Sequence, residues 1–263
     1  EARGHTIACV PRNLLALQAS REVSDYLQDH QVTDVVHLAA QSNPAGGNHE
    51  LFYTDNAFLT DRLLGVCAAV KLPGRFLYVS ATSVYGQSDQ PFDETSRLNP
   101  LNHYAASKML AEAFVGWRQD ELDVAIVRPS NCIGRGQKQQ YLVPKLVSAF
   151  RSRDPEIAMG DTRISRDFVD VRDATDILGR LLEASPGLPH IANASSGKAT
   201  SIAQVIELLS DITGHRPAIL YDERFVRPGD ILFQACRNHA AIRLGHRPRY
   251  SLRETLQWML GKE

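Results

Sequence analysis

Short apolar runs alternate with helix-length amphipathic stretches in the first half of the chain, and this alternation constrains the fold more than any other feature. The runs, which are rich in Val, Ile and Leu, are residues 6–10, 14–17, 35–39, 76–80 and 124–127. The helical stretches are residues 21–30, about 55–70 and about 103–119. Apolar runs of this length are typical of strands buried on both faces. We therefore predict an α/β protein with a doubly wound parallel sheet and right-handed crossovers.

The pattern changes after Pro129, where loops containing Gly and Arg precede a helix at residues 144–150 and a later helix near 201–213. This change predicts a smaller second lobe. The expected division is a first domain of residues 1–130, to which about 166–194 return, and a lobe within 131–263 made of about 131–165 and 195–263.

The bulk composition excludes several classes of protein. With 263 residues, of which 43% are hydrophobic, the chain can bury a sizeable core. The formal net charge is -1, so we expect no general attraction to nucleic acid or to an anionic membrane. The four cysteines and nine histidines have no metal-ligand spacing, and no apolar run approaches a membrane span. These features predict a cytoplasmic protein without a metal site.

Tyr104 and Lys108 are four residues apart on a helix that is predicted to begin just after Pro100. Their side chains therefore lie on one face of that helix. An ammonium ~5 Å from a phenol, at an effective dielectric of about 20, favours the phenolate by roughly 3 kcal/mol, or about two pKa units. Such a tyrosine can exchange a proton with a sugar hydroxyl or ketone while hydride moves at the same carbon.

The residues before this pair strengthen the interpretation. Residues 78–86 read Tyr-Val-Ser-Ala-Thr-Ser-Val-Tyr-Gly, and they precede Tyr104 by about twenty positions. In order and spacing the chain resembles the extended short-chain dehydrogenases/reductases of the NAD-dependent epimerase/dehydratase family. The resemblance implies a Rossmann-type fold, a nicotinamide cofactor and a nucleoside-diphosphate sugar as substrate.

Further segments match this family along the chain, and the resemblance implies the roles of their residues. Tyr104 and Lys108 are expected to be catalytic. The residues expected to bind the cofactor are Arg12, Leu38, Ala39, Ala40, Asn56, Val79, Ser80, Tyr104, Lys108 and Arg128. The residues expected to bind the substrate are Gln41, Thr82, Asn131, Leu142, Val143, Arg166 and Arg227. Arg166 and Arg227 stand in motifs that resemble the diphosphate clamp, which suits a guanidinium because it forks onto two oxygens.

The chain departs from the family pattern in two places. The first strand and the Gly-rich pyrophosphate loop (GxxGxxG) are absent, so we expect further residues upstream in the native protein. The position of the usual catalytic Ser or Thr, four residues before Tyr85, is Ala81. Thr82, or else Ser83, is expected to supply the catalytic hydroxyl, with Ser80 as a further alternative. Because hydroxyls also stand where related dehydratases carry acidic residues, a dehydratase is not expected.

The second lobe resembles GDP-6-deoxy-4-keto-hexose reductases in three segments, around Asn131, Arg166 and Asn193. The leading prediction is a reductase of a 4-keto-6-deoxyhexose linked to a nucleoside diphosphate, with GDP favoured. A UDP-sugar 4-epimerase and a catalytically weak scaffold of the same fold are the alternatives. Pro11-Arg12 stands where an acidic residue would bind the ribose of NAD, which favours NADP over NAD. Apolar positions on two of the helices, as in relatives, imply a homodimer.

Overall fold

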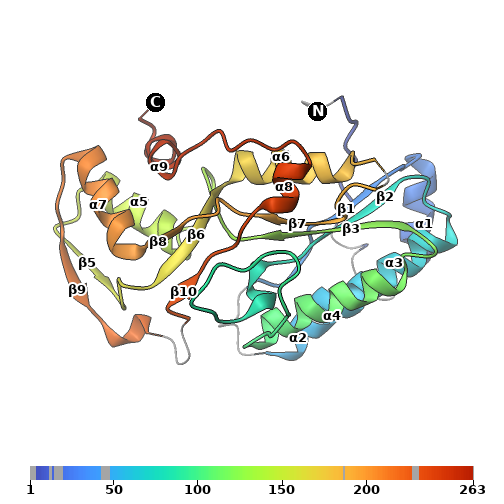
Figure 1. Cartoon of the computed structure of the whole chain (residues 1–263), viewed down its shortest axis with the longest axis horizontal. Coiled ribbons are helices and arrows are strands. Elements are labelled where there is room, and N and C mark those ends of the chain that lie inside the picture. The colour runs from blue at the N-terminus through green and yellow to red at the C-terminus, as the bar shows by residue number, and fades with distance from the viewer. Residues whose placement is uncertain are drawn as a thin grey trace. The chain divides into compact units, whose positions relative to one another are not determined.

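A computed structural model of the chain describes residues 4–11, 14, 20–42, 48–185, 187–226 and 231–262. The chain forms two compact units and passes between them several times (Figure 1). Unit 1 comprises residues 1–86, 96–128 and 178–192, and unit 2 comprises residues 87–95, 129–177 and 193–263. Which unit binds cofactor and which binds sugar remains a prediction.

A four-stranded sheet with the order β1-β2-β3-β7 organises unit 1. Its strands are β1 (Val35–His37), β2 (Arg75–Val79), β3 (Asp123–Pro129) and β7 (Ile191–Ala194). Strand β2 pairs in parallel with both β1 and β3. Phe76, Leu77 and Tyr78 are all fully buried, so side chains on both faces of β2 are covered. This burial explains why the strand is continuously apolar and does not alternate.

Three helices pack on one face of this sheet (Figure 1). They are α1 (Ser20–Asp29), α3 (Leu59–Ala69) and α4 (His103–Trp117). The core between them and the sheet includes Val23 of α1, Leu64 of α3, Val115 of α4 and Phe76 of β2. Helix α4 begins where the Asn102 side chain accepts a hydrogen bond from the Ala105 backbone N–H, which satisfies one of the free donors of the first turn.

The helix before the sheet's second strand contains a wide turn. Short α2 (Glu50–Phe52) continues into η2 (Tyr53–Phe58), a π-helical turn, and then into α3. A π turn adds one residue to the helical repeat and is frequent at functional sites. Here the turn carries Asn56, which is completely buried.

Unit 2 is built from small sheets and several helical segments. One sheet has the order β10-β6-β4 with β8 added on β6, and the other pairs β5 with β9. The strands are β4 (Asn131–Ile133), β5 (Glu156–Met159), β6 (Ser165–Asp170), β8 (Ala199–Ser201), β9 (Ala218–Tyr221) and β10 (Phe233–Gln234). The helical segments are α5 (Leu142–Ser152), α7 (Ile202–Thr213), η4 (Glu223–Phe225), α8 (His239–Arg243) and α9 (Leu252–Leu260).

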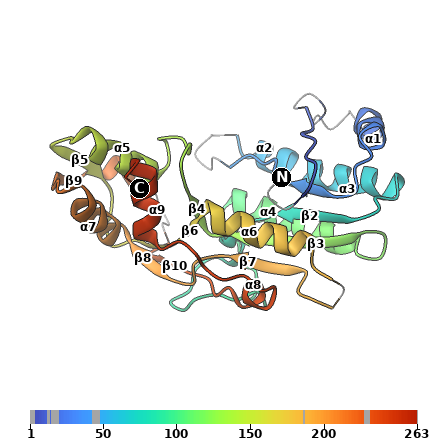
Figure 2. The same ribbon diagram turned by 90° about the horizontal axis from the view of Figure 1, so that it is seen from above.

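The core of unit 2 lies where α5, α7 and α9 meet β6, and Figure 2 shows these helices close together. Its completely buried side chains include Leu146, Leu209 and Leu256. Helices α7 and α9 both begin with a capping box, at Ser201 and Ser251, so their starts are fixed by local sequence. Helix α6 (Val171–Leu182) follows β6 directly and ends in unit 1, where Leu181 is buried.

The structure confirms the predicted α/β class and most predicted elements. The strands near residues 35–39, 76–80 and 124–127 and the predicted helices are present within a few residues. The strand predicted at residues 6–10 is wrong: these residues are in no strand, most of them are exposed, and no described segment pairs with them. Of the run 14–17, all but Leu14 lie outside the described residues. Among described residues, no helix is both long and apolar enough to cross a membrane.

Candidate active site

The side chains of Tyr104 and Lys108 come from one face of α4, as predicted from their spacing. Lys108 is only 2% exposed. Its Nζ donates a hydrogen bond of 2.6 Å to the backbone carbonyl of Val79, at the end of β2, and lies 4.4 Å from the ring centroid of Tyr78. The ammonium is thus held by main-chain oxygen and an aromatic face.

Burial lowers the pKa of Lys108 from 10.5 to about 7, although the charge of Glu112 opposes this shift. Removing an ammonium from water disfavours its charged form. The protonation of Lys108 therefore changes near neutral pH, which is the range in which a proton-transfer site operates.

Tyr104 is half-buried and is positioned by the helical segment around η2. Its ring meets the buried ring of Phe52 edge to face, with the centroids 6.1 Å apart. Its backbone carbonyl accepts a hydrogen bond of 2.8 Å from the hydroxyl of Ser107. The Tyr53 hydroxyl oxygen lies 3.0 Å from Nδ1 of the neighbouring His103. These contacts fix the first turn of α4, which carries the phenol.

Asn56 connects this turn to the chain segment that follows β1. Its Oδ1 accepts a bond of 2.7 Å from the Gln41 N–H, and its Nδ2 donates to the Gln41 carbonyl at 3.1 Å. The same Nδ2 donates to the Ser107 hydroxyl at 2.9 Å. The π turn at Asn56 therefore brings together residues that are 15 and 51 positions away in the sequence.

The three candidate hydroxyls lie where β2 ends and η3 (Thr82–Tyr85) begins. Ala81 between them is extended. Thr82 is buried. Among the described residues, the buried Oγ atoms of Ser80 and Ser83 have no hydrogen-bond partner. Buried hydroxyls of this kind are normally satisfied, so the edge of β2 beside Lys108 fits a polar ligand such as a nicotinamide cofactor.

Arg128, predicted to bind cofactor, makes internal contacts. Its guanidinium is 4% exposed and pairs with the buried carboxylate of Glu112, at 2.6 Å between Nη2 and Oε2. Its Nη1 donates to the Tyr85 hydroxyl at 2.8 Å. These contacts give Arg128 a structural role, and its contact with cofactor remains a prediction. Glu112 was not among the residues predicted from the sequence, although its position four residues after Lys108 places it on the same helix face.

The remaining cofactor candidates follow β1. Leu38 and Ala40 are exposed and Ala39 is half-buried. Exposed residues at the carboxyl end of a parallel strand are where a ligand binds in sheets of this kind. Arg12 lies outside the described residues.

Four of the predicted substrate residues lie in unit 2. Asn131 donates to the backbone carbonyl of Asp167 at 3.2 Å, and Arg166 donates to the carbonyl of Ile231 at 2.6 Å. Leu142 is half-buried at the start of α5, whereas Val143 is buried in the core. The burial of Val143 gives it a packing role. Arg227 lies outside the described residues.

In the motif around Arg166, the neighbouring Asp167 has a structural role. Asp167 is 1% exposed, and its carboxylate accepts hydrogen bonds from the Ser130 hydroxyl and from the backbone N–H groups of Ser196 and Gly197, at 3.1, 2.8 and 3.0 Å. A single carboxylate therefore joins three segments of unit 2. Glu94, which the sequence analysis missed, acts similarly: its Oε1 accepts from the N–H of Asn193 at 3.0 Å.

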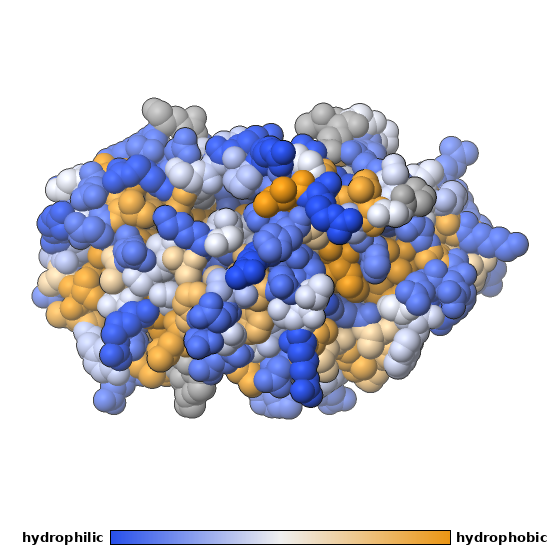
Figure 3. Space-filling model, viewed as in Figure 1, coloured by the Kyte–Doolittle hydropathy of each residue, from blue (hydrophilic) through white to orange (hydrophobic). Residues whose placement is uncertain are grey.

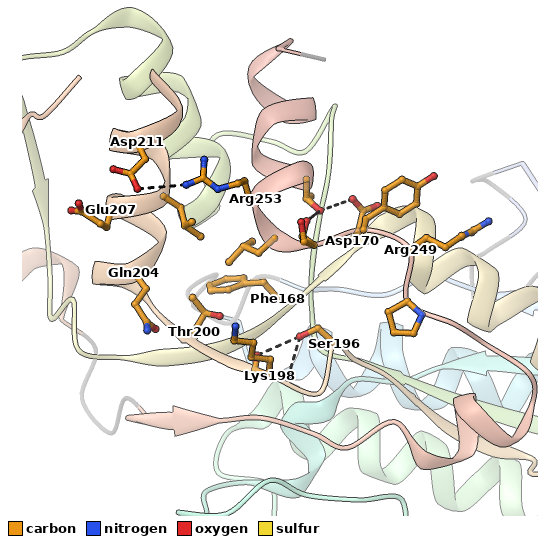
Figure 4. Close-up of a pocket in the computed structure, with 16 residues that line it drawn as sticks. Phe168, Asp170, Ser196, Lys198, Thr200, Gln204, Glu207, Asp211, Arg249 and Arg253 are labelled. Atoms are coloured by element: carbon orange, nitrogen blue, oxygen red, sulfur yellow. Dashed lines mark hydrogen bonds and ion pairs between the residues drawn. The ribbon is translucent and has the colours of Figure 1, made fainter. Parts of the chain in front are cut away.

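A cavity of about 720 Å³ also lies in unit 2, between β6, α7 and residues 248–255 (Figure 4). Its carboxylates are already engaged: Asp170 pairs with Arg172 at 2.8 Å, and Asp211 faces Arg253 at 3.5 Å. No predicted site residue that the structure describes lines this cavity. In the same described part, no group of three or more His, Cys, Asp or Glu side chains could hold a metal ion.

Comparison with known proteins gives concordant results. The model of the NAD dependent epimerase/dehydratase family matches residues 2–194. GDP-6-deoxy-D-talose 4-dehydrogenase of Aggregatibacter actinomycetemcomitans is 34% identical over 211 residues, which cover 80% of this chain and 71% of that protein. GDP-6-deoxy-D-mannose reductase of Pseudomonas aeruginosa is 30% identical over 245 residues, which cover 86% of this chain and 78% of that protein.

Among solved structures, RMD from Pseudomonas aeruginosa complexed with NADPH matches with a TM-score of 0.85 and 28% sequence identity. The match covers 99% of this chain and 91% of that chain. The similarity therefore extends over both units of the fold.

Proposed function

The chain belongs to the NAD-dependent epimerase/dehydratase family, and on that premise we propose that it reduces a 4-keto-6-deoxyhexose linked to a nucleoside diphosphate, with GDP favoured. The family makes it a nicotinamide-dependent enzyme. The two relatives named above support the finer assignment, because both are named for a GDP-linked 6-deoxy sugar.

One observation carries the proposal: a desolvated lysine, with its pKa lowered to about 7, lies one helical turn from Tyr104. An ammonium at this distance stabilises the phenolate, so Tyr104 can give up its proton near neutral pH. In the proposed reaction Tyr104 gives this proton to the C4 oxygen of the sugar. Thr82, or in its place Ser83, hydrogen-bonds the same oxygen.

A bound nicotinamide supplies the hydride that C4 receives. Val79, Ser80 and Lys108 would hold it at the end of β2, and the buried Ser80 hydroxyl is suited to this because it has no partner among the described residues. Leu38, Ala39 and Ala40 would line its path. Arg12 favours a 2′-phosphate, so we propose NADP(H), with NAD as the alternative.

The nucleoside diphosphate is proposed to lie against unit 2. Arg166 and Arg227 would pair with its phosphates, since guanidinium groups bind two oxygens at once. Asn131 and Leu142 are the further substrate contacts proposed in unit 2, and Gln41 is a separate proposed contact.

A homodimer formed through α3 and α4 is part of the proposal. Apolar residues gather over these two helices on the face shown in Figure 3. Phe58 just before α3 is 49% exposed, and Trp117 at the end of α4 is 71% exposed. A contiguous apolar patch on a surface is typical of an interaction site.

The test is reduction of GDP-, UDP- and dTDP-linked 4-keto-6-deoxyhexoses, followed by oxidation of NADPH or NADH. We expect turnover with the GDP sugar and NADPH, and loss of at least about 100-fold in kcat for Tyr104→Phe. Tyr250→Phe is the matched control, because the new ring can still stack on Arg172, which lies 3.5 Å from the Tyr250 centroid. Turnover that survives Tyr104→Phe would overturn the proposed mechanism.

A second incubation separates the epimerase. UDP-hexoses are mixed with the protein and no added cofactor, and the sugar products are resolved by chromatography. An epimerase that retains its cofactor interconverts C4 epimers under these conditions, whereas the proposed reductase leaves them unchanged.

A further inference from the structure

A third polar side chain continues the face of α4 that carries the proposed active-site pair. Glu112 follows Lys108 by four residues, as Lys108 follows Tyr104. It is 5% exposed, although a carboxylate is strongly solvated in water. Burying this carboxylate costs free energy, so a cationic partner must offset the cost.

The partner is Arg128 on β3. Its Nε donates to Glu112 Oε1 at 3.0 Å and its Nη2 to Oε2 at 2.6 Å, which is a two-pronged ion pair. Tyr85 also holds the guanidinium in place. Its hydroxyl accepts a hydrogen bond from Arg128 Nη1 at 2.8 Å, and its ring centroid lies 5.0 Å from the guanidinium carbon. The carboxylate is thereby fixed on the helix face of Lys108.

Among the residues that the structure describes, little other negative charge surrounds Lys108. The described titratable and charged groups around it are Tyr104 and Glu112 on α4, Tyr78 on β2, His37 on β1, Arg62 beyond His37 and Arg128 beyond Glu112. Burial and the charge of Lys108 lower the pKa of His37 to about 3, so this ring is neutral near pH 7. Burial and the charge of Glu112 raise the pKa of Tyr78, so this phenol is neutral as well.

We propose that Glu112 is a positioning residue for the reaction: held by Arg128, its carboxylate keeps Lys108 in the ammonium form that Tyr104 requires. This inference rests on the proposed function, because it assigns the charge of Lys108 to the tuning of Tyr104. The burial of Lys108 favours the neutral amine, and Glu112 opposes that effect. Arg128 holds Glu112 and is not proposed to contact the reacting atoms.

The first test needs neither substrate nor cofactor. The six lysines of the full chain are labelled with 13C at Cε, and their titration is followed by NMR, with Lys108→Arg identifying the Lys108 signal. In Glu112→Gln we expect the Lys108 pKa to fall by roughly one unit, from the loss of a charge one helical turn away that Arg128 partly neutralises. An unchanged Lys108 titration would overturn the proposal.

Two further variants control for folding and for the loss of any carboxylate. Glu112→Gln leaves the buried Arg128 without the carboxylate that balances its charge. The double variant Glu112→Gln/Arg128→Gln is therefore titrated in parallel, and its Lys108 pKa is expected to fall as well. Glu112→Asp keeps the charge and should restore most of the wild-type titration. Glu121→Gln removes a carboxylate that is 52% exposed, beyond the end of α4, and should leave Lys108 unchanged.

The second test connects the titration to catalysis. If Lys108 must be protonated for catalysis, the alkaline limb of the pH profile of kcat/KM should move about one unit to lower pH in Glu112→Gln. In Glu112→Asp this limb should lie close to its wild-type position. A Lys108 titration that shifts while this limb stays fixed would exclude the positioning role. The Tyr104→Phe result tests the proposed function separately, so the two failures are distinguishable.

Discussion

The ammonium of Lys108 donates its hydrogen bond to the backbone carbonyl of Val79, at 2.6 Å, and so connects the middle of α4 to the carboxyl end of β2. A helix residue and a strand end that are 29 positions apart are held together by one cation. The contact explains why the lysine is buried: the site excludes water around the charge and replaces it with a fixed dipole.

Replacing Lys108 by Met should lower kcat by about 100-fold or more, because the phenolate of Tyr104 loses its stabilising charge. The measurement is steady-state reduction of the 4-keto sugar nucleotide. Lys262→Met is the matched control, since Lys262 also donates to a backbone carbonyl, that of Ile212 at 3.2 Å, but is exposed. Equal activity of the two variants would contradict a catalytic role for Lys108.

The same lysine should make stability depend on alkaline pH. Its pKa is about 7 in the folded chain and 10.5 in the reference state, so between these values the unfolded chain binds more protons. Stability from this group therefore rises with pH across that window, by up to about 1.4 kcal/mol per pH unit. Urea unfolding at several pH values should show this slope in the wild type and a smaller slope in Lys108→Met.

His37 should also make the free energy of unfolding rise with pH, in this case in the acidic range. Burial, and then the charges of Lys108 and Arg62, lower its pKa from 6.5 to about 3, and its Nε2 lies 3.0 Å from the Thr60 hydroxyl oxygen. Below pH 6.5 the unfolded chain binds the extra proton, so stability is lost as the pH falls towards 3. His37→Gln should weaken this acid dependence in thermal unfolding. An identical dependence in the variant would exclude His37 as its source.

Asn56→Ala should lower the free energy of unfolding by roughly 2–4 kcal/mol, because the Gln41 backbone groups and Ser107 lose a buried partner. Asn48→Ala serves as the control: Asn48 is exposed and accepts one bond, from the N–H of Glu50 at 3.0 Å. Chemical denaturation compares the two. A cost for Asn56→Ala no larger than that of the control would show that the π turn is held by other contacts.

Two conservative variants can show whether Thr82 or Ser83 supplies the catalytic hydroxyl. We expect Thr82→Val to lower kcat on the order of 10-fold with little change in KM, and Ser83→Ala to have the smaller effect. Steady-state kinetics with the 4-keto sugar nucleotide provides the comparison. The opposite order would assign the role to Ser83, whose buried Oγ has no partner among described residues.

Local patterns were sufficient to predict strands β1, β2 and β3 and helix α4. The apolar run around Phe76 and the spacing of Tyr104 and Lys108 each depend on neighbours within a few residues, so periodicity predicts them. The strand expected at residues 6–10 is wrong for the complementary reason. A strand needs a hydrogen-bonded neighbour, and apolar composition alone does not supply one.

The buried partners of Arg128 could not be predicted from the sequence. Its motif predicts a cofactor contact, which stays a prediction, and the fold in addition pairs the guanidinium with Glu112 and Tyr85. Likewise, Asp167 belongs to a motif expected to bind diphosphate, yet its own carboxylate joins the Ser196 turn to β6. Contacts between segments far apart in sequence leave no periodic signal.

The residue order is enough to predict the α/β class, the helix face shared by Tyr104 and Lys108 and the family, because these follow from short-range spacing. The desolvation of Lys108 against Val79 and the pairing of the buried Glu112 carboxylate with Arg128 follow from the folded arrangement of distant segments. The physical reason is that the energy of a charge depends on the water it has lost and on the charges packed around it, and both are set by segments brought together in folding.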